Sequence, residues 1–128
     1  MAKKRVFISF DYENDLDIKG CLVQQSKQKD SPFSIVDMSI KAPIDQKWKK
    51  VARDRIRKCD VVIFLCGMHT DTAGGVSAEM TITQEEGIPY LLLAGHHSKS
   101  VRPKGAKSTD IMHKWSWKEI HSMLYDSQ

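Results

Sequence analysis

The six residues Val61–Cys66 form the feature that most limits how this chain can fold. Their side chains are apolar except for the thiol of Cys66, and the run lies between Asp60 and Gly67. An apolar run of this length, bounded in this way, is typical of a strand that is buried on both faces. The run therefore predicts a central strand of a parallel sheet that is covered by helices.

Apolar runs and helical periodicity alternate along the rest of the chain. Further strands are predicted at residues 5–10, 33–38, 88–94 and 111–114, and helices at 16–28, 44–58, 75–86 and from 116 onward. This alternation predicts one domain over residues 1–128 with a flavodoxin-like, three-layer α/β fold. We expect a five-stranded, mainly parallel sheet in the order 2-1-3-4-5 with helices on both faces. The loops after the first and third strands would then border one crevice.

Composition narrows the class of protein. The chain has 128 residues, a net charge of +4 and 41% hydrophobic residues, which is ordinary for a soluble domain. Three cysteines without a CxxC pair indicate neither a zinc site nor a disulfide framework, and Cys66 is expected in the core. The first residues do not resemble a signal peptide, and no segment is apolar enough to span a membrane. We therefore expect a cytoplasmic protein without a metal site and without membrane or nucleic-acid partners.

Two functions found among proteins of this fold conflict with the residues that follow the first and third predicted strands. A phosphorelay receiver needs an aspartate at the end of the third strand, where this chain has Cys66 and Gly67. A flavodoxin needs a phosphate cradle of small and hydroxyl residues after the first strand, where this chain has the acidic stretch 11–15. Neither GxGxxG nor GxxxxGK[ST] occurs. The sequence disfavours phosphoryl transfer and FMN binding.

A carboxylate, Glu79, follows the central strand near the start of the next predicted helix. Ligands of open α/β sheets bind beyond the carboxyl ends of the strands. Cleavage of an N-glycosidic bond builds positive charge on a sugar ring, and one carboxylate can stabilise that charge. Glu79 is therefore the candidate catalytic group, and the alternative is an exposed helix residue without a chemical role.

Three further stretches are informative when taken in order: RVFISFDYEND from Arg5, VDMS from Val36 and IRKCDVVIFLCGMHTDTAGGVSAEM from Ile56. Together they resemble the TIR-like domain family, in particular the short bacterial and archaeal proteins related to the TIR proteins of Thoeris antiphage defence. In the last stretch, Gly67, Thr70, Val76 and Glu79 fall on the family pattern of Gly-x-x-Thr followed by Trp-Val-x-x-Glu-Ile. Gly75 replaces the Trp and Met80 replaces an aliphatic residue, and the similarity covers about residues 3–94.

The resemblance implies an enzyme that cleaves NAD⁺ to nicotinamide and ADP-ribose, or to a cyclised or otherwise linked nucleotide that acts as a signal. Glu79 would be the catalytic carboxylate. NAD⁺ would be the substrate, and no cofactor is implied. The residues expected to bind substrate are Ser9, Phe10, Asp11, Asp37, Ser39, Gly67 and Thr70.

The resemblance also implies partners. TIR domains associate with copies of themselves to complete the site, and a separate effector protein would sense the product. Two other functions stay open at this point. The chain is then either a non-catalytic TIR-like interaction module or an enzyme resembling nucleoside 2-deoxyribosyltransferases, which also use a glutamate on this fold.

Overall fold

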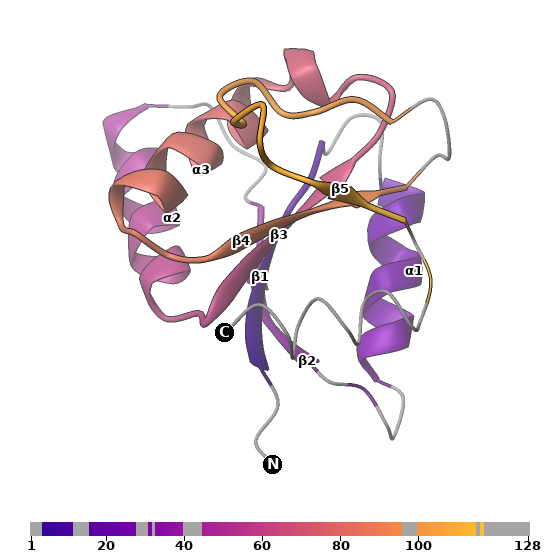
Figure 1. Cartoon of the computed structure of the whole chain (residues 1–128). Helices are drawn as coiled ribbons and strands as arrows, with labels where there is room; N and C mark the ends of the chain where they lie inside the picture. The colour runs from indigo at the N-terminus through magenta and orange to yellow at the C-terminus, as the bar shows by residue number, and fades with distance from the viewer. Residues whose placement is uncertain are drawn as a thin grey trace.

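The structure is a computed structural model that describes residues 4–11, 16–27, 31, 33–39, 45–95, 100–114 and 116. Strands and helices alternate along these residues (Figure 1). In chain order they are β1 (Lys4–Ser9), α1 (Leu16–Ser26), β2 (Phe33–Met38), α2 (Gln46–Arg57), β3 (Val61–Cys66), the 3₁₀ turn η1 (Thr70–Thr72), α3 (Gly74–Glu85), β4 (Tyr90–Ala94) and β5 (Met112–His113). Apart from residue 116, the helix predicted from that position onward lies outside the described residues.

All five strands run parallel in the order β2-β1-β3-β4-β5, which confirms the predicted topology. Helix α1 covers one face of the sheet, and α2 and α3 cover the other (Figure 1). Strand β3 occupies the centre, and all six of its residues are buried, as the apolar run predicts. The carboxyl ends of β1 and β3 therefore meet at the same edge, next to the start of α3.

The core has two halves because successive strand residues point to opposite faces. Val6, Ile8, Ile63 and Leu65 pack on the face covered by α1, together with residues such as Leu22. Phe7, Val62, Phe64 and Cys66 pack on the other face against α2 and α3. The even-numbered residues of β1 and the odd-numbered residues of β3 therefore lie on the α1 face.

Strand β2 contains a register shift opposite Val6 and Phe7, where one extra residue enters the strand. Before the shift Ile35 packs against the core on the α1 face, and after it Met38 packs against that same cluster. An unbroken strand would put residues 35 and 37 on one face and Met38 on the other. The bulge therefore reverses the alternation, so that Ser39 turns toward the face covered by α3.

Helix boundaries follow local capping. The side chain of Asp45 caps α2 by accepting a 2.8 Å hydrogen bond from the N–H of Trp48. Gly87, with φ of 67°, follows the end of α3 as predicted, since a residue in this conformation ends helices. Strand β4 begins two residues later than predicted, because the N–H of Ile88 still donates to the carbonyl of Thr83 in α3.

The segment between β4 and β5 is tied to the rest of the fold. Gln84 of α3 donates a 3.0 Å hydrogen bond to the carbonyl of Gly105. The hydroxyl of Tyr90 donates to Asp110 at 2.6 Å. These bonds hold residues 100–110 against α3 and β4, so most of the long polar stretch predicted as a loop has a defined path here.

None of the helices in the described ranges is both long and apolar enough to cross a membrane. The described residues also contain no group of three or more His, Cys, Asp or Glu side chains that is arranged to hold a metal ion. Cys59 and Cys66 are buried, and their thiols donate to the carbonyls of Arg55 and Phe64, respectively.

Candidate functional site

Glu79 lies inside the protein rather than on its surface. It belongs to the side of α3 that also carries Val76, Met80 and Thr83, and all four residues are buried. The spacing of these residues places them on one face of a helix, which here faces the sheet. The side chain of Glu79 is 0% exposed. The alternative prediction of an exposed helix residue is therefore wrong.

Two serine hydroxyls bind the same oxygen of Glu79. Ser9, at the end of β1, donates a 2.6 Å hydrogen bond to Oε1. Ser39, directly after β2, donates a second 2.6 Å bond to that oxygen and itself accepts a 3.0 Å bond from the N–H of Phe10. The other carboxyl oxygen, Oε2, is buried without a hydrogen-bond partner in the described part of the chain. A buried polar atom left in this state is costly and is rare in folded proteins.

Burial raises the pKa of Glu79 to about 7, because desolvation disfavours the charged carboxylate. The hydrogen bonds from Ser39 and Ser9 act in the opposite direction, since both favour the charged form. Near neutral pH, the protein therefore holds this group in both its protonated and its charged form. A carboxyl group with a pKa this far from its ordinary value is a mark of functional sites.

The positions of both serines follow from the sheet. Ser9 lies two residues after Phe7 and therefore shares the face of β1 that α2 and α3 cover. Ser39 reaches the same face only because of the bulge in β2, and its N–H extends the sheet by donating to the carbonyl of Ile8 at 2.8 Å. The parallel order brings the two strand ends together beneath α3.

Phe10 and Asp11 follow Ser9 but lie differently. Phe10 is 2% exposed and packs in the core on the α1 face, where the ammonium of Lys19 lies 6.0 Å from the centre of its ring. Its backbone N–H still contributes to the site through Ser39. Asp11 is buried at the same edge of the sheet. Asp37 belongs to β2, and its side chain lies outside the described part of the structure.

Gly67 and Thr70 shape the loop between β3 and α3. The hydroxyl of Thr70 accepts a 2.7 Å hydrogen bond from the N–H of Gly67 and makes a long 3.5 Å contact with the carbonyl of Leu65. Both residues are buried. The Gly-x-x-Thr pattern thus closes a tight turn that sets where α3 begins, and Thr70 directs its hydroxyl to the backbone of this loop.

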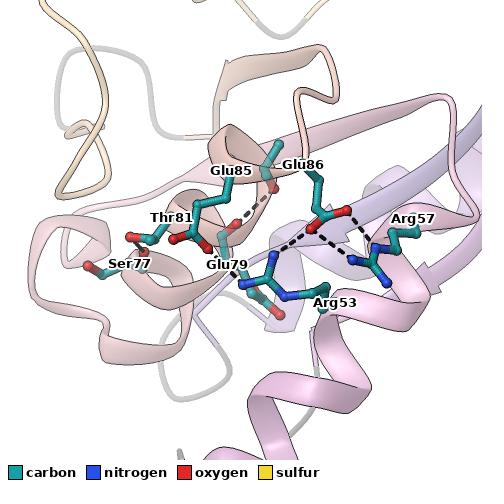
Figure 2. A network of polar contacts seen from close by, with 8 residues as sticks. Arg53, Arg57, Ser77, Glu79, Thr81, Glu85 and Glu86 are labelled. Atoms are coloured by element: carbon teal, nitrogen blue, oxygen red, sulfur yellow. Dashed lines mark hydrogen bonds and ion pairs between the residues drawn. The ribbon is translucent and has the colours of Figure 1, made fainter.

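A second polar cluster joins α2 to α3 farther along the helix. Arg53 donates to Glu86 and, at 2.7 Å, to Glu85, while Arg57 donates to Glu86 through two nitrogens (Figure 2). The two guanidinium groups lower the pKa of Glu86 to about 2. We did not predict this cluster, although the charge pattern of the two helices could have suggested it. Its role is to fix the end of α3 against α2.

The arrangement around Glu79 permits a limited chemistry. Oε1 is held by protein hydroxyls, whereas Oε2 can accept a hydrogen bond from a hydroxyl group, donate one when protonated, or face a developing positive charge. Among the described residues, no side chain forms a hydrogen bond with this oxygen.

Comparison with known proteins shows which family the chain resembles and which residues the match covers. Residues 7–100 match the family model described as "Thoeris protein ThsB, TIR-like domain", and Ser9, Ser39 and Glu79 all lie within that range. No curated protein matches this chain in sequence. Seven chains of solved structures are similar, among them a prokaryotic SEFIR domain with 17% sequence identity and a TM-score of 0.55. The match covers 98% of this chain and 89% of that chain, and at this identity it shows a common fold alone.

Proposed function

This chain belongs to the family of TIR-like domains of the Thoeris protein ThsB, and on that premise we propose that it cleaves the N-glycosidic bond of NAD⁺ with Glu79 as the catalytic carboxylate. The products are nicotinamide and an ADP-ribose-derived nucleotide, either linear or cyclised, that acts as a signal in antiphage defence. The observation that carries this proposal is the buried carboxyl of Glu79, which has one anchored oxygen and one oxygen without a hydrogen-bond partner among the residues that the structure describes.

The reaction needs little beyond a carboxylate. The bond between C1′ of the ribose and the ring nitrogen of nicotinamide breaks, and its electron pair leaves with nicotinamide as a neutral base. Positive charge develops on the ribose, where the carboxylate of Glu79 stabilises it. Water then adds to C1′ and releases a proton, or a nucleophile of the same nucleotide adds and closes a ring. No resident cofactor takes part in this scheme.

The pKa of Glu79 sets the pH dependence of this scheme. Only the charged carboxylate stabilises a cation, and burial keeps about half of the groups protonated near pH 7. The rate constant kcat/KM of the free enzyme should therefore rise with pH through about 7 and then level off. Binding of the positively charged nicotinamide ring favours the charged carboxylate and moves the corresponding pKa of the complex downward.

The complete burial of Glu79 links catalysis to assembly. A substrate reaches Oε2 only when the groups that cover it move, because the side chain is 0% exposed in the single chain. We assign the movement of these covering groups to self-association, which is common among TIR domains. Activity per molecule should therefore increase with protein concentration. The product then acts on a separate effector protein.

The decisive experiment is to incubate concentrated protein with NAD⁺ and to identify the products by mass spectrometry. Glu79→Gln should abolish nicotinamide release, whereas Glu85→Gln, on the exposed side of the same helix, should retain it. Matching activity in wild type and Glu79→Gln would disprove the proposal. Base exchange on deoxynucleosides with NAD⁺ left intact would instead support a nucleoside deoxyribosyltransferase-like enzyme.

The burial of Glu79 also favours one rival function. As a buried polar group that joins the ends of β1 and β2 to α3, it serves equally to orient α3 in a non-catalytic interaction module. This rival predicts no turnover of NAD⁺ at any protein concentration. It also predicts that surface substitutions on α2 and α3, rather than Glu79→Gln, abolish function in the cell.

A further inference from the structure

The two serines that contact Glu79 converge on a single atom. The Oγ atoms of Ser9 and Ser39 both lie 2.6 Å from Oε1, although Ser9 ends β1 and Ser39 follows β2, 30 positions later in the chain. Both side chains are buried, with 0% and 6% exposure. A carboxyl oxygen accepts about two hydrogen bonds, one for each lone pair. The protein therefore occupies Oε1 fully.

The orientation of this group is fixed by the backbone. The Oγ of Ser39 accepts a hydrogen bond from the N–H of Phe10, so its own proton is directed to Glu79. The residue that supplies this N–H follows Ser9 directly in the chain. One strand end thus orients both hydroxyls, and rotation of the carboxyl about its last bond would break two hydrogen bonds at once.

The other carboxyl oxygen, Oε2, is buried and has no hydrogen-bond partner among the described residues. A hydroxyl group satisfies this atom in either protonation state, since a hydroxyl donates to a carboxylate and accepts from a carboxylic acid. An ammonium group would satisfy only the charged form. The chemistry at this position therefore favours a neutral hydroxyl such as that of a sugar.

We propose that Ser9 and Ser39 are positioning residues that hold Glu79 by Oε1 and reserve Oε2 for a ribose hydroxyl of the substrate. The identity of the sugar rests on the proposed function, whereas the anchoring of Oε1 does not. The proposal changes the role assigned to both serines from the sequence. They act through Glu79 and do not themselves bind substrate.

The first test measures the anchoring without any substrate. The chain contains five glutamates, so ¹³C labelling of their side-chain carboxyl carbons gives a simple NMR spectrum. The signal of Glu79 is identified by its loss in Glu79→Gln. Because both hydroxyls favour the charged carboxylate, Ser9→Ala and Ser39→Ala should each raise the pKa of Glu79, by about one unit.

The matched control is Ser31→Ala. Ser31 is also buried, but its hydroxyl bonds the carbonyl of Phe33 at 2.8 Å, so its loss removes a buried hydrogen bond away from Glu79. This variant should leave the pKa of Glu79 unchanged. Far-UV circular dichroism of all three variants checks that each is folded. An unchanged or lowered pKa in the folded Ser9 and Ser39 variants would overturn the anchoring.

The second test measures catalysis. Misplacement of a catalytic group should lower kcat for nicotinamide release by roughly tenfold to a hundredfold while KM changes little. The rise of activity with pH should also move to higher pH in Ser9→Ala and Ser39→Ala. Wild-type kcat and an unmoved pH profile in both variants would refute a positioning role. If the wild type releases no nicotinamide, the proposed function fails, and the NMR titration still decides the anchoring.

Discussion

Replacing Glu79 with glutamine should stabilise the protein relative to the wild type. This gain in the free energy of unfolding should grow as the pH rises. Glutamine has the same shape and is neutral, so its carbonyl oxygen can accept the hydrogen bonds of Ser9 and Ser39. Wild-type Glu79 must instead ionise in a buried position, and the folded state resists this because its pKa is raised from 4.5 to about 7. The substitution therefore removes a cost that a functional carboxylate imposes on the fold.

The size and sign of this effect follow from proton linkage. Between about pH 4.5 and pH 7 the unfolded chain binds fewer protons at this residue than the folded chain, so the stability of the wild type falls as pH rises. The fall is complete above about pH 7 and absent below about pH 4.5. A difference of about 2.5 pH units at 1.36 kcal/mol per unit amounts to about 3 kcal/mol. The gain in the glutamine variant, relative to its value in acid, should reach this magnitude.

Urea unfolding of wild type and Glu79→Gln over about pH 4.5 to pH 8.5 measures the effect. All other titrating groups are shared, so the difference in the free energy of unfolding isolates Glu79. Ser31→Ala provides a control without a titrating group, and its difference from wild type should not depend on pH. A flat or falling difference for Glu79→Gln would show that the carboxyl is not held in a desolvated site and would remove the physical basis of the proposed function.

Three further outcomes test other parts of the fold. Glu86→Gln should destabilise the protein at neutral pH. Its difference from wild type in the free energy of unfolding should shrink as the pH falls from about 4.5 toward 2, because the two arginines keep the carboxylate of Glu86 charged over that interval. Acid unfolding curves measure this difference. Thr70→Val should cost about 1–3 kcal/mol in urea unfolding, since it leaves the buried N–H of Gly67 without its acceptor. Gly20→Ala should raise the free energy of unfolding by about 0.5–1 kcal/mol, because Gly20 lies within α1 and an added Cβ meets no atom within 4 Å; a lowered melting temperature would contradict this.

Much of the architecture could be read from local patterns. The apolar run Val61–Cys66 is continuous because this strand is buried on both faces. The helix that includes Trp48, Ala52 and Ile56 is buried on one face, and this leaves a helical period in the sequence. The parallel order followed from the alternation of strands and helices. The observed ends of strands and helices differ from the predicted ends by one or two residues, as at Ile88, because a single backbone hydrogen bond decides where an element ends.

The function assigned to particular residues was harder to read. Phe10 was expected beside the substrate and lies in the core on the opposite face of the sheet from Glu79, because alternation along β1 turns it away from Ser9. Thr70 was expected to bind substrate, and its hydroxyl instead closes the loop before α3. Whether either residue also contacts NAD⁺ stays a prediction.

The amino-acid sequence by itself determined which segments become strands and helices and which carboxylate lies at the switch point of the sheet, because these properties depend on short-range periodicity and chain order. The environment of Glu79 depended on tertiary structure. Ser9, Ser39 and Glu79 are separated by 30 and 40 positions, and one extra residue in β2 decides which face Ser39 occupies. A bulge and a buried hydrogen-bond network arise from packing between distant segments, and such packing leaves no period in the sequence.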